Sequence, residues 1–455
     1  MTNVSDFGAA GDGKRDDTDA IQHAIADGDA AVLFPPGDYS ISKTIEVDLS
    51  KTGRLAVFGS GGTAKIIMTA SGPALRIVGN HAGTADPGSM KPDIWRRQRM
   101  PMIAEIEIEG AHQEADGIEL VGCVQPILRN VGLHRLRHGV HLTKRNRNVL
   151  IEGCQIYHNI GAGIFFDGVN LHQINIIGNH ISYNRLGGIR IERSEVRNLQ
   201  ITGNDIEYNT DRTHKIGIEP TAEIYIDATA QGATVNEATI ASNTIQARPS
   251  KGGANLRIIE DGKQKDRPPG LYAITGNVIG SQTNNVHLTG CYGITLTGNN
   301  IYSAAEHNLL LDGNCRQIVV GSNQFRRHTP NMETGIRITE CNDCVISGCH
   351  VLDEAEGGQA SGRPLLAIDR SQRITVGASQ LLATGTTALQ IHESNDVIVT
   401  GCTISTAATD RDRRTIHWTG EGSGNLVSAC RLAGSAPAHV EDAEVRFESN
   451  VESVE

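Results

Sequence analysis

Three acidic residues stand at matching places in the sequence. Asp167, Glu192 and Asp227 each follow directly after a short segment in which apolar residues alternate with others. If those segments are neighbouring strands, the three carboxyl groups stack one strand apart, and repulsion raises the pKa of at least one of them. A protonated carboxyl beside an ionised one is the pair that acid/base cleavage of a glycosidic bond requires, so we predict that these residues are catalytic.

The spacing of these carboxyl groups bears on stereochemistry. Strands one coil apart would hold them about 5 Å apart, and strands two coils apart about 9–10 Å. Retaining glycosidases use about 5–5.5 Å and inverting ones about 6.5–9.5 Å, so Asp167 with Glu192 suits the first and Asp167 with Asp227 the second. The alternative is structural. Asp is favoured in turns at strand ends, and these three residues, which we call the acidic column, would then be solvated turn residues without a catalytic role.

Residues that could position a sugar lie beside the acidic ones. His141, Arg190 and Tyr225 occupy the middle of the alternating segments, and we expect them on the same face of the sheet. Two polar insertions, 209–222 and 248–269, flank the coil that carries Asp227. Insertions in solenoids gather on the binding face, so the substrate is expected there.

Loops supply three more candidate substrate contacts. His214 and Lys215 belong to the first insertion. Trp95 stands among arginines in the polar segment 81–100, where its ring suits stacking on a sugar. The alternative for Trp95 is that it anchors its own loop.

A sequence repeat must position all of these side chains. Its pattern is apolar, any, apolar, any, Gly or Ser, Asn or Cys, any, apolar. The glycines of three successive copies, Gly153, Gly178 and Gly203, are 25 residues apart. Strand-period alternation with a turn residue at such a spacing is typical of a solenoid of short parallel strands.

One position of the repeat carries Asn or Cys. Stacked Asn side chains can hydrogen-bond to one another along a solenoid, and a buried Cys can replace them as a small apolar residue. We therefore predict that these cysteines are neither metal ligands nor disulfide partners, and we predict no metal site. The members are Asn179, Asn204, Asn243, Asn277, Asn299, Asn323, Cys154, Cys349, Cys402 and Cys430.

Composition excludes several classes of function. The net charge of −11 argues against nucleic acid or an acidic membrane as partner, and no apolar run is long enough to span a membrane. Nine cysteines and no recognisable signal peptide favour a cytoplasmic protein, or a secreted one whose leader was removed. The expected partner is a poly- or oligosaccharide, and a homotrimer is one oligomeric state left open.

The N-terminal sequence carries a family resemblance. It contains Asp6-Phe7-Gly8-Ala9-Ala10-Gly11-Asp12-Gly13 and Phe34-Pro35-Pro36-Gly37-Asp38-Tyr39, with Asp17 or Thr18 placed to cap a helix over residues 19–26. This stretch resembles the start of the pectate-lyase-like right-handed parallel β-helix superfamily, which includes polygalacturonases, rhamnogalacturonases, inulin fructotransferases and phage tailspikes. The resemblance implies a right-handed coil and a saccharide ligand, but no single reaction, because this fold hosts many. The inner motifs of polygalacturonases are not found.

The sequence thus predicts an all-β chain. We expect a cap and first coil over residues 1–45, a right-handed parallel β-helix solenoid of about 11–13 coils over 46–440, and an acidic tail over 441–455. The leading functional hypothesis is a glycoside hydrolase or transglycosylase without a cofactor. The alternatives are a polysaccharide lyase that uses Ca²⁺ or a basic residue, and a non-catalytic, tailspike-like saccharide-binding protein.

Overall fold

The computed structural model describes the chain except for residues 84–85, 211–220, 262–269, 328–332, 334, 354–362, 408–413, 435–437 and 454–455. The chain forms two compact units, which are described separately. Unit 1 contains Met1–Ile218 and Ala222–Thr239, and unit 2 contains Glu219–Thr221 and Ile240–Glu455.

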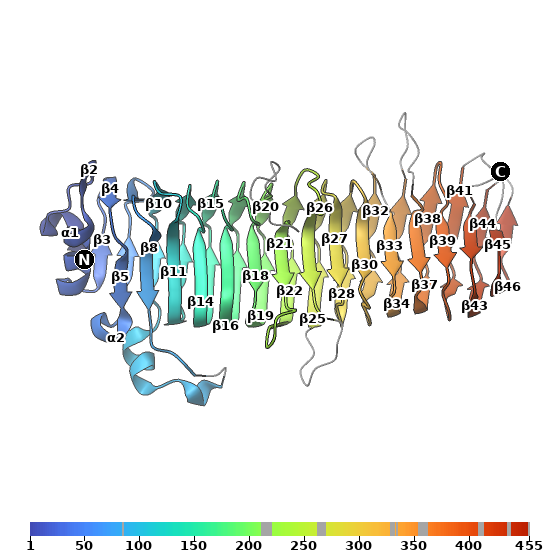
Figure 1. The fold of residues 1–455 in the computed structure, drawn as a ribbon, viewed down its shortest axis with the longest axis horizontal. Helices are drawn as coiled ribbons and strands as arrows, with labels where there is room; N and C mark the ends of the chain where they lie inside the picture. The colour runs from blue at the N-terminus through green and yellow to red at the C-terminus, as the bar shows by residue number, and fades with distance from the viewer. Residues whose placement is uncertain are drawn as a thin grey trace. The chain divides into compact units, whose positions relative to one another are not determined.

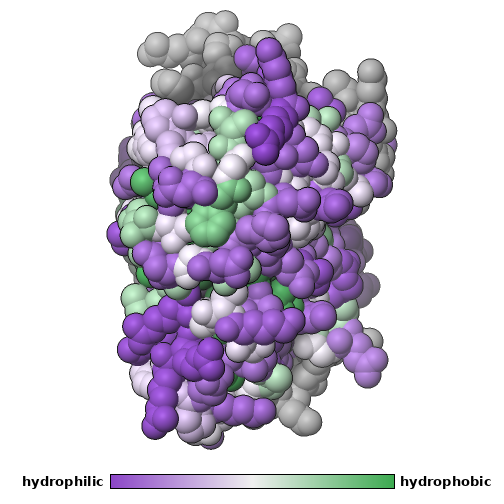
Figure 2. Space-filling model, turned by 90° about the vertical axis from the view of Figure 1, so that its left-hand side faces the viewer, coloured by the Kyte–Doolittle hydropathy of each residue, from purple (hydrophilic) through white to green (hydrophobic). Residues whose placement is uncertain are grey.

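Unit 1 begins with a small helical cap. The 3₁₀ helix η1 (Val4–Phe7) and the helix α1 (Thr18–Asp27) precede the first coil, and α1 buries Ile21, Ala24 and Ile25 against it. The predicted helix is therefore confirmed. Asp17 stands at its N-cap position, but its carboxylate instead accepts hydrogen bonds from the backbone N–H groups of Ala10 (2.7 Å) and Gly11 (3.0 Å). The surface over this cap is largely hydrophilic, with a small apolar area near its middle (Figure 2).

The rest of unit 1 is a stack of parallel strands (Figure 1). In some coils two strand segments are continuous, and the main sheet then has one long strand, as in β14 and β16. The main sheet contains β3 (Ala31–Leu33), β5 (Ile45–Asp48), β6 (Ala56–Phe58), β8 (Gly72–Val78), β9 (Met102–Ala104), β11 (Ala115–Val124), β12 (Ile127–Arg129), β14 (Val140–Glu152), β16 (Ile164–Ile177), β18 (Ile189–Glu192), β19 (Glu195–Thr202) and β21 (Ala222–Asp227). The second sheet contains β4 (Gly37–Ile41), β7 (Ala64–Met68), β10 (Glu107–Gly110), β13 (Gly132–His134), β15 (Gln155–Tyr157), β17 (His180–Ser182) and β20 (Asp205–Glu207).

Unit 2 repeats the same design. Its main sheet includes β24 (Ala254–Ile259), β27 (Asn284–Thr289), β30 (His307–Asp312), β33 (Ile336–Thr339), β36 (Leu366–Asp369), β39 (Leu389–His392) and β42 (Ile416–Thr419). Its second sheet includes β26 (Val278–Gly280), β29 (Asn300–Tyr302), β32 (Gln324–Arg326), β35 (His350–Leu352), β38 (Gln380–Ala383), β41 (Thr403–Thr406) and β44 (Arg431–Ala433). Within the predicted acidic tail, β46 (Ala443–Glu448) pairs with β43 (Gly422–Ser428).

The core of each unit is built from aliphatic rungs. In unit 1, Ile164, Ile189 and Ile224 pair in register on successive strands and are fully buried. Their side chains alternate with outward-facing ones, as the period of a strand requires. The predicted all-β fold of stacked parallel coils is confirmed.

The predicted Asn ladder is present and hydrogen-bonded. In unit 1, Asn179 Nδ2 donates to Asn204 Oδ1 (2.9 Å), and Cys154 holds the position before it, its backbone N–H donating to Asn179 Oδ1 (2.9 Å). All nine cysteines lie in the described part of the chain, where they are buried and form no disulfide. The predicted burial of the cysteines, with Cys154 in the ladder, is confirmed.

A second ladder was not predicted. Asn159 donates to Asn184, and Asn184 to Asn209, each from Nδ2 to Oδ1 at 2.7 Å, and the ladder ends on the buried carboxyl of Glu223. These asparagines follow the short strands β15, β17 and β20. None of the helices formed by the described residues combines the length and apolar character needed to cross a membrane.

Candidate functional site

Strand register in unit 1 brings the predicted site residues into two adjacent columns. In the first column, His141 of β14 pairs with Phe165 of β16, which pairs with Arg190 of β18, which pairs with Tyr225 of β21. In the second, Asp167 pairs with Glu192, and Glu192 with Asp227. The predicted placement of all six residues is therefore correct.

Polar contacts link these columns into one network, which we call the β14–β21 network. Asp167 accepts from Arg193 Nη2 (2.6 Å) and lies 3.3 Å from His141 Nε2. Arg193 also donates from Nη1 to Glu192 Oε2 (3.0 Å), and Arg190 pairs with the other oxygen of Glu192. The guanidinium of Arg190 in turn lies over the ring of Tyr225, 4.2 Å from its centroid.

Arg193 changes the electrostatics expected for the acidic column. Partial burial acts to raise the pKa of Asp167, but the hydrogen bonds from Arg193 and His141 outweigh it, and the pKa lies below its ordinary value. The expected rise of a stacked carboxyl's pKa is therefore not found at Asp167. Arg193 sits in the left-handed turn after β18 (φ 51°), which directs its side chain back over the column.

Asp227 has turn contacts of its own. Its Oδ1 accepts from the backbone N–H (2.9 Å) and the hydroxyl (2.7 Å) of Thr229, and the Tyr225 hydroxyl lies 3.5 Å from its Oδ2. These bonds are typical of an Asp in a turn, and they support the structural alternative to a catalytic role for Asp227. The insertion that carries His214 and Lys215 enters β21 at its other end, at Ala222, and both residues lie outside the described residues.

An aromatic cluster backs the network on one side. The ring of Phe165 stacks on His141 (centroids 5.5 Å apart), and His138, which sequence reasoning missed, packs 4.9 Å from Phe165. Burial lowers the pKa of His138 to about 4, so this imidazole is neutral near pH 7. His141 is thus held between an apolar stack and the carboxylate of Asp167.

Trp95 lies in the short π-helix η3 (Ile94–Gln98). Its side chain is 47% exposed, and the guanidinium of Arg99 lies over its ring at 4.7 Å. One ring face is therefore occupied by Arg99. The helix packs beside α2 (Leu49–Thr52) and β11, and the residues that it buries are Ile94 and Gln98.

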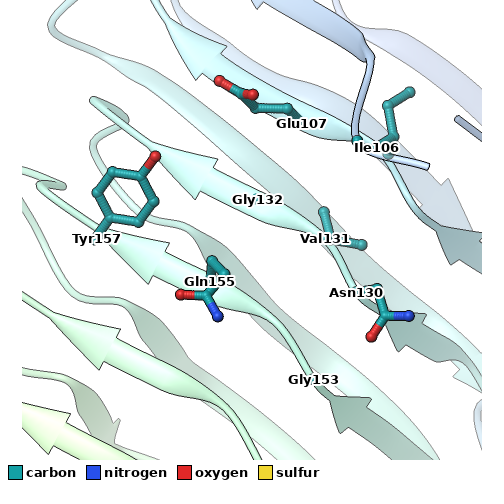
Figure 3. Close-up of a pocket in the computed structure, with 9 residues that line it drawn as sticks. Ile106, Glu107, Asn130, Val131, Gly132, Gly153, Gln155 and Tyr157 are labelled. Carbon is teal, nitrogen blue, oxygen red and sulfur yellow. The ribbon is translucent and has the colours of Figure 1, made fainter. Parts of the chain in front are cut away.

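The second sheet of unit 1 carries a groove that the sequence did not predict. It has a volume of about 630 Å³ and crosses β10, β13 and β15 (Figure 3). It is lined by Gly62, Ile106, Glu107, Asn130, Val131, Gly132, Gly153, Gln155 and Tyr157.

Two clusters among the described residues bring potential metal ligands together. Beside the groove, Glu107, Glu109 and His134 offer three ligand atoms within 4.8 Å of one another. Both oxygens of Glu109 are already taken, one by Lys65 Nζ (3.0 Å) and one by Arg135 Nη1 (2.7 Å), so this set does not suit a cation. In unit 2, the ligand atoms of His417, His439 and Glu441 also lie within 4.8 Å of one another, and two of them belong to imidazoles, which transition metals prefer.

Comparisons with known proteins cover the chain in two parts. The family model for rhamnogalacturonase A/epimerase, pectate lyase-like, matches residues 1–98, and the model for the right handed beta helix region matches residues 102–245 and 284–438. The pre-mature gene product 12 of bacteriophage phi29 is a similar solved structure, with a TM-score of 0.51 and 11% identity over 99% of this chain and 72% of that chain. The predicted superfamily and the right-handed coil are confirmed.

Similarity to curated proteins is local. Alginate lyase 7 of Azotobacter vinelandii is 57% identical over 44 residues, which is 9% of this chain and 5% of that protein. A mannuronan C5-epimerase of the same organism is 39% identical over 84 residues, 17% of this chain and 10% of that protein. The chain thus matches a tenth or less of the length of these two relatives.

Proposed function

The chain belongs to the right-handed beta helix family, and from this premise we propose that it is a carbohydrate-active enzyme that cleaves or transfers glycosidic bonds. The substrate would be a poly- or oligosaccharide lying across β14, β16, β18 and β21. Because this fold hosts many reactions, the proposal depends on one observation: the unbroken series of contacts from His141 through Asp167, Arg193, Glu192 and Arg190 to Tyr225. The names of the two curated relatives support a saccharide as substrate.

The network contains the groups that acid/base catalysis needs. An imidazole beside an ionised carboxylate, as His141 lies beside Asp167, can give a proton to a leaving oxygen or take one from the substrate. Two guanidinium groups contact Glu192, and a carboxylate at this position can activate water or stabilise positive charge on the sugar. Arg193, with 54% of its side chain exposed, can hydrogen-bond to a sugar hydroxyl or carboxylate.

One observation favours a lyase as the second candidate. Elimination beside a uronate carboxylate needs positive charge to stabilise the intermediate and a base to remove the proton. Arg190 and Arg193 supply the charge within the network, and His141 is the base in reach of the same face. In this candidate mechanism, the two arginines would stabilise the charge of the intermediate in place of Ca²⁺.

The test is a turnover assay on alginate, polygalacturonate, laminarin, dextran and inulin. Reducing ends and the ultraviolet absorbance of unsaturated products would be read together, for wild type, Asp167→Asn, His141→Asn and Glu192→Gln. We expect each substitution to lower kcat/KM by about 100-fold or more, as removal of an acid/base group does. Asp343→Asn is the matched control, because Asp343 pairs with Arg373 on the surface of unit 2.

The readouts separate the candidates. Reducing ends without ultraviolet absorbance establish hydrolysis or transfer, and unsaturated product establishes the lyase. Full activity in all three network variants would show that catalysis does not depend on this face of unit 1. Binding without turnover on any of the five glycans would favour a non-catalytic saccharide-binding protein.

A further inference from the structure

The groove on the second sheet of unit 1 exists because a side chain is missing from its middle. Gly132 begins β13 and pairs with Glu107 of β10 on one side and Gln155 of β15 on the other. The strands of Glu107 and Gln155 are therefore two spacings apart, about 9.5 Å, with no side chain between them (Figure 3). A Cβ atom added to Gly132 would lie 3.3 Å from Glu107 Cγ, so any larger residue would fill this gap.

The lining of the gap is suited to hydroxyl groups. The Glu107 carboxylate, the Tyr157 phenol and the Asn130 and Gln155 amides point from its edges, with Glu107 and Tyr157 toward one end and Asn130 toward the other (Figure 3). Together they present donors and acceptors around a floor of backbone and glycine. A pyranose ring carries hydroxyls around its rim, and these donors and acceptors can hydrogen-bond to them.

Two of these groups are fixed before a ligand arrives. His134 Nε2 lies 2.5 Å from Glu107 Oε1, and the His134 ring stacks on Tyr157 with centroids 5.1 Å apart and planes 5° apart. Glu107, His134 and Tyr157 thus form one rigid group across three strands. Preorganised polar groups lower the entropy that binding costs.

The charge of the lining selects among saccharides. Glu107 is its charged residue, and the neighbouring cations Lys65, Arg135 and Arg129 are paired with Glu109, Glu109 and Glu152, respectively. A uronate would meet a carboxylate here without a free guanidinium or ammonium in the lining. The arginine-rich β14–β21 network has the opposite preference.

We propose that this groove is a saccharide-binding subsite that accepts a neutral sugar unit. It goes beyond the proposed catalytic function, because it lies on the other sheet and needs no turnover. The ligand class is a neutral oligosaccharide recognised through Glu107, Gln155, Tyr157 and Asn130.

The test measures binding with cleavage switched off. Asp167→Asn protein would be titrated with cellotriose, laminaritriose and trimannuronate by saturation-transfer NMR and calorimetry. We expect one of the neutral trisaccharides to bind, and Gly132→Val to weaken that binding at least tenfold by filling the gap. Asn300→Val is the matched control, since Asn300 is an exposed residue at the start of β29, the same strand position in unit 2.

A second substitution guards against misfolding of the valine variant. Glu107→Gln keeps the size of the side chain but replaces one acceptor oxygen by an amide group that only donates. We expect it to weaken neutral trisaccharide binding about fivefold while the melting temperature stays unchanged. The proposal is overturned if neither neutral trisaccharide binds, if neither substitution weakens binding, or if trimannuronate competes for the same signals. Turnover assays on the unmodified network report independently, so loss of this subsite and loss of the proposed enzyme function are distinguishable.

Discussion

Arg193 holds together two carboxylates that would otherwise repel each other. Arg193 donates a hydrogen bond of 2.6 Å to Asp167 and another of 3.0 Å to Glu192. Burial acts to raise the pKa of Asp167, and the hydrogen bond from Arg193 is the largest of the effects that lower it. Without this cation, burial would be opposed less strongly and the pKa of Asp167 would rise. The ionisation of Asp167 therefore depends in part on a residue that lies outside the acidic column.

Replacing Arg193 should consequently change the pH dependence of turnover. If ionised Asp167 is required, activity falls as the pH drops through its pKa, so a higher pKa moves the acid limb of the kcat/KM profile to higher pH. We expect this upward shift in Arg193→Gln and its partial reversal in Arg193→Lys, measured as pH profiles on the best glycan of the panel. Arg197→Gln is the control, because Arg197 pairs with Glu195 on β19. An acid limb that does not move in Arg193→Gln would show that Asp167 is not the group that titrates.

The columns were predictable from the sequence, and the network between them was not. Strand period alone places Asp167, Glu192 and Asp227 on successive coils, because each follows an alternating segment of the same length. The reach of Arg193 depends on a left-handed turn residue, and Arg occurs there without any glycine or asparagine to signal it. A cation directly after Glu192 was the one available clue.

At the scale of the strands and turns, the Asn ladders fix how one coil sits on the next. Asn179 accepts from the backbone N–H of Cys154 (2.9 Å), donates to Asn204 Oδ1 (2.9 Å) and donates to the Ile151 carbonyl (3.1 Å), all in a buried turn. A buried donor or acceptor that loses its partner costs about 1–3 kcal/mol. Each ladder residue therefore stabilises three turns at once.

Asn179→Ala should lower the free energy of unfolding by about 3 kcal/mol, since it leaves the Cys154 N–H and the Ile151 carbonyl without their partner. Chemical denaturation monitored by circular dichroism measures this change. Asn175→Ala removes the same side chain from an exposed position of β16 and should stay within about 0.5 kcal/mol of wild type. Equal effects of the two substitutions would contradict a structural role for the ladder.

The second ladder and the groove show what pattern reading misses at this scale. Asn159, Asn184 and Asn209 are also 25 residues apart, so the second ladder has the same period but lies outside the repeat that carries the first ladder. The groove gave no such signal. A single glycine at the start of a strand looks like any turn glycine until the register sets it between Glu107 and Gln155.

At the scale of the whole molecule, two buried groups of unit 1 give stability opposite dependences on pH. Burial lowers the pKa of His138 to about 4, so its contribution is complete above pH about 6.5 and is lost as the pH falls toward 4. Burial raises the pKa of Glu223 well above its ordinary value, against the hydrogen bonds from Asn209 that act to lower it. Its contribution is complete below pH about 4.5 and is lost as the pH rises toward that higher pKa.

Glu223 therefore makes a prediction for thermal unfolding of the intact chain. Above pH about 4.5 the native state holds a proton at Glu223 that the unfolded chain releases, so stability should fall by up to about 1.4 kcal/mol per pH unit until the buried carboxyl ionises. Glu223→Gln cannot release that proton, yet its amide oxygen can still accept from the Asn209 backbone and side-chain N–H groups. We expect the variant to match wild type near pH 5 and to exceed its melting temperature increasingly toward pH 8, as measured by calorimetry at each pH. Glu237→Gln is the control, because Glu237 accepts a similar bond from Asn198 (2.6 Å) but lies exposed. Parallel wild-type and Glu223→Gln curves across this range would mean that the ladder ends on an ionised carboxylate, and the pH dependence of the fold would then have to come from other groups.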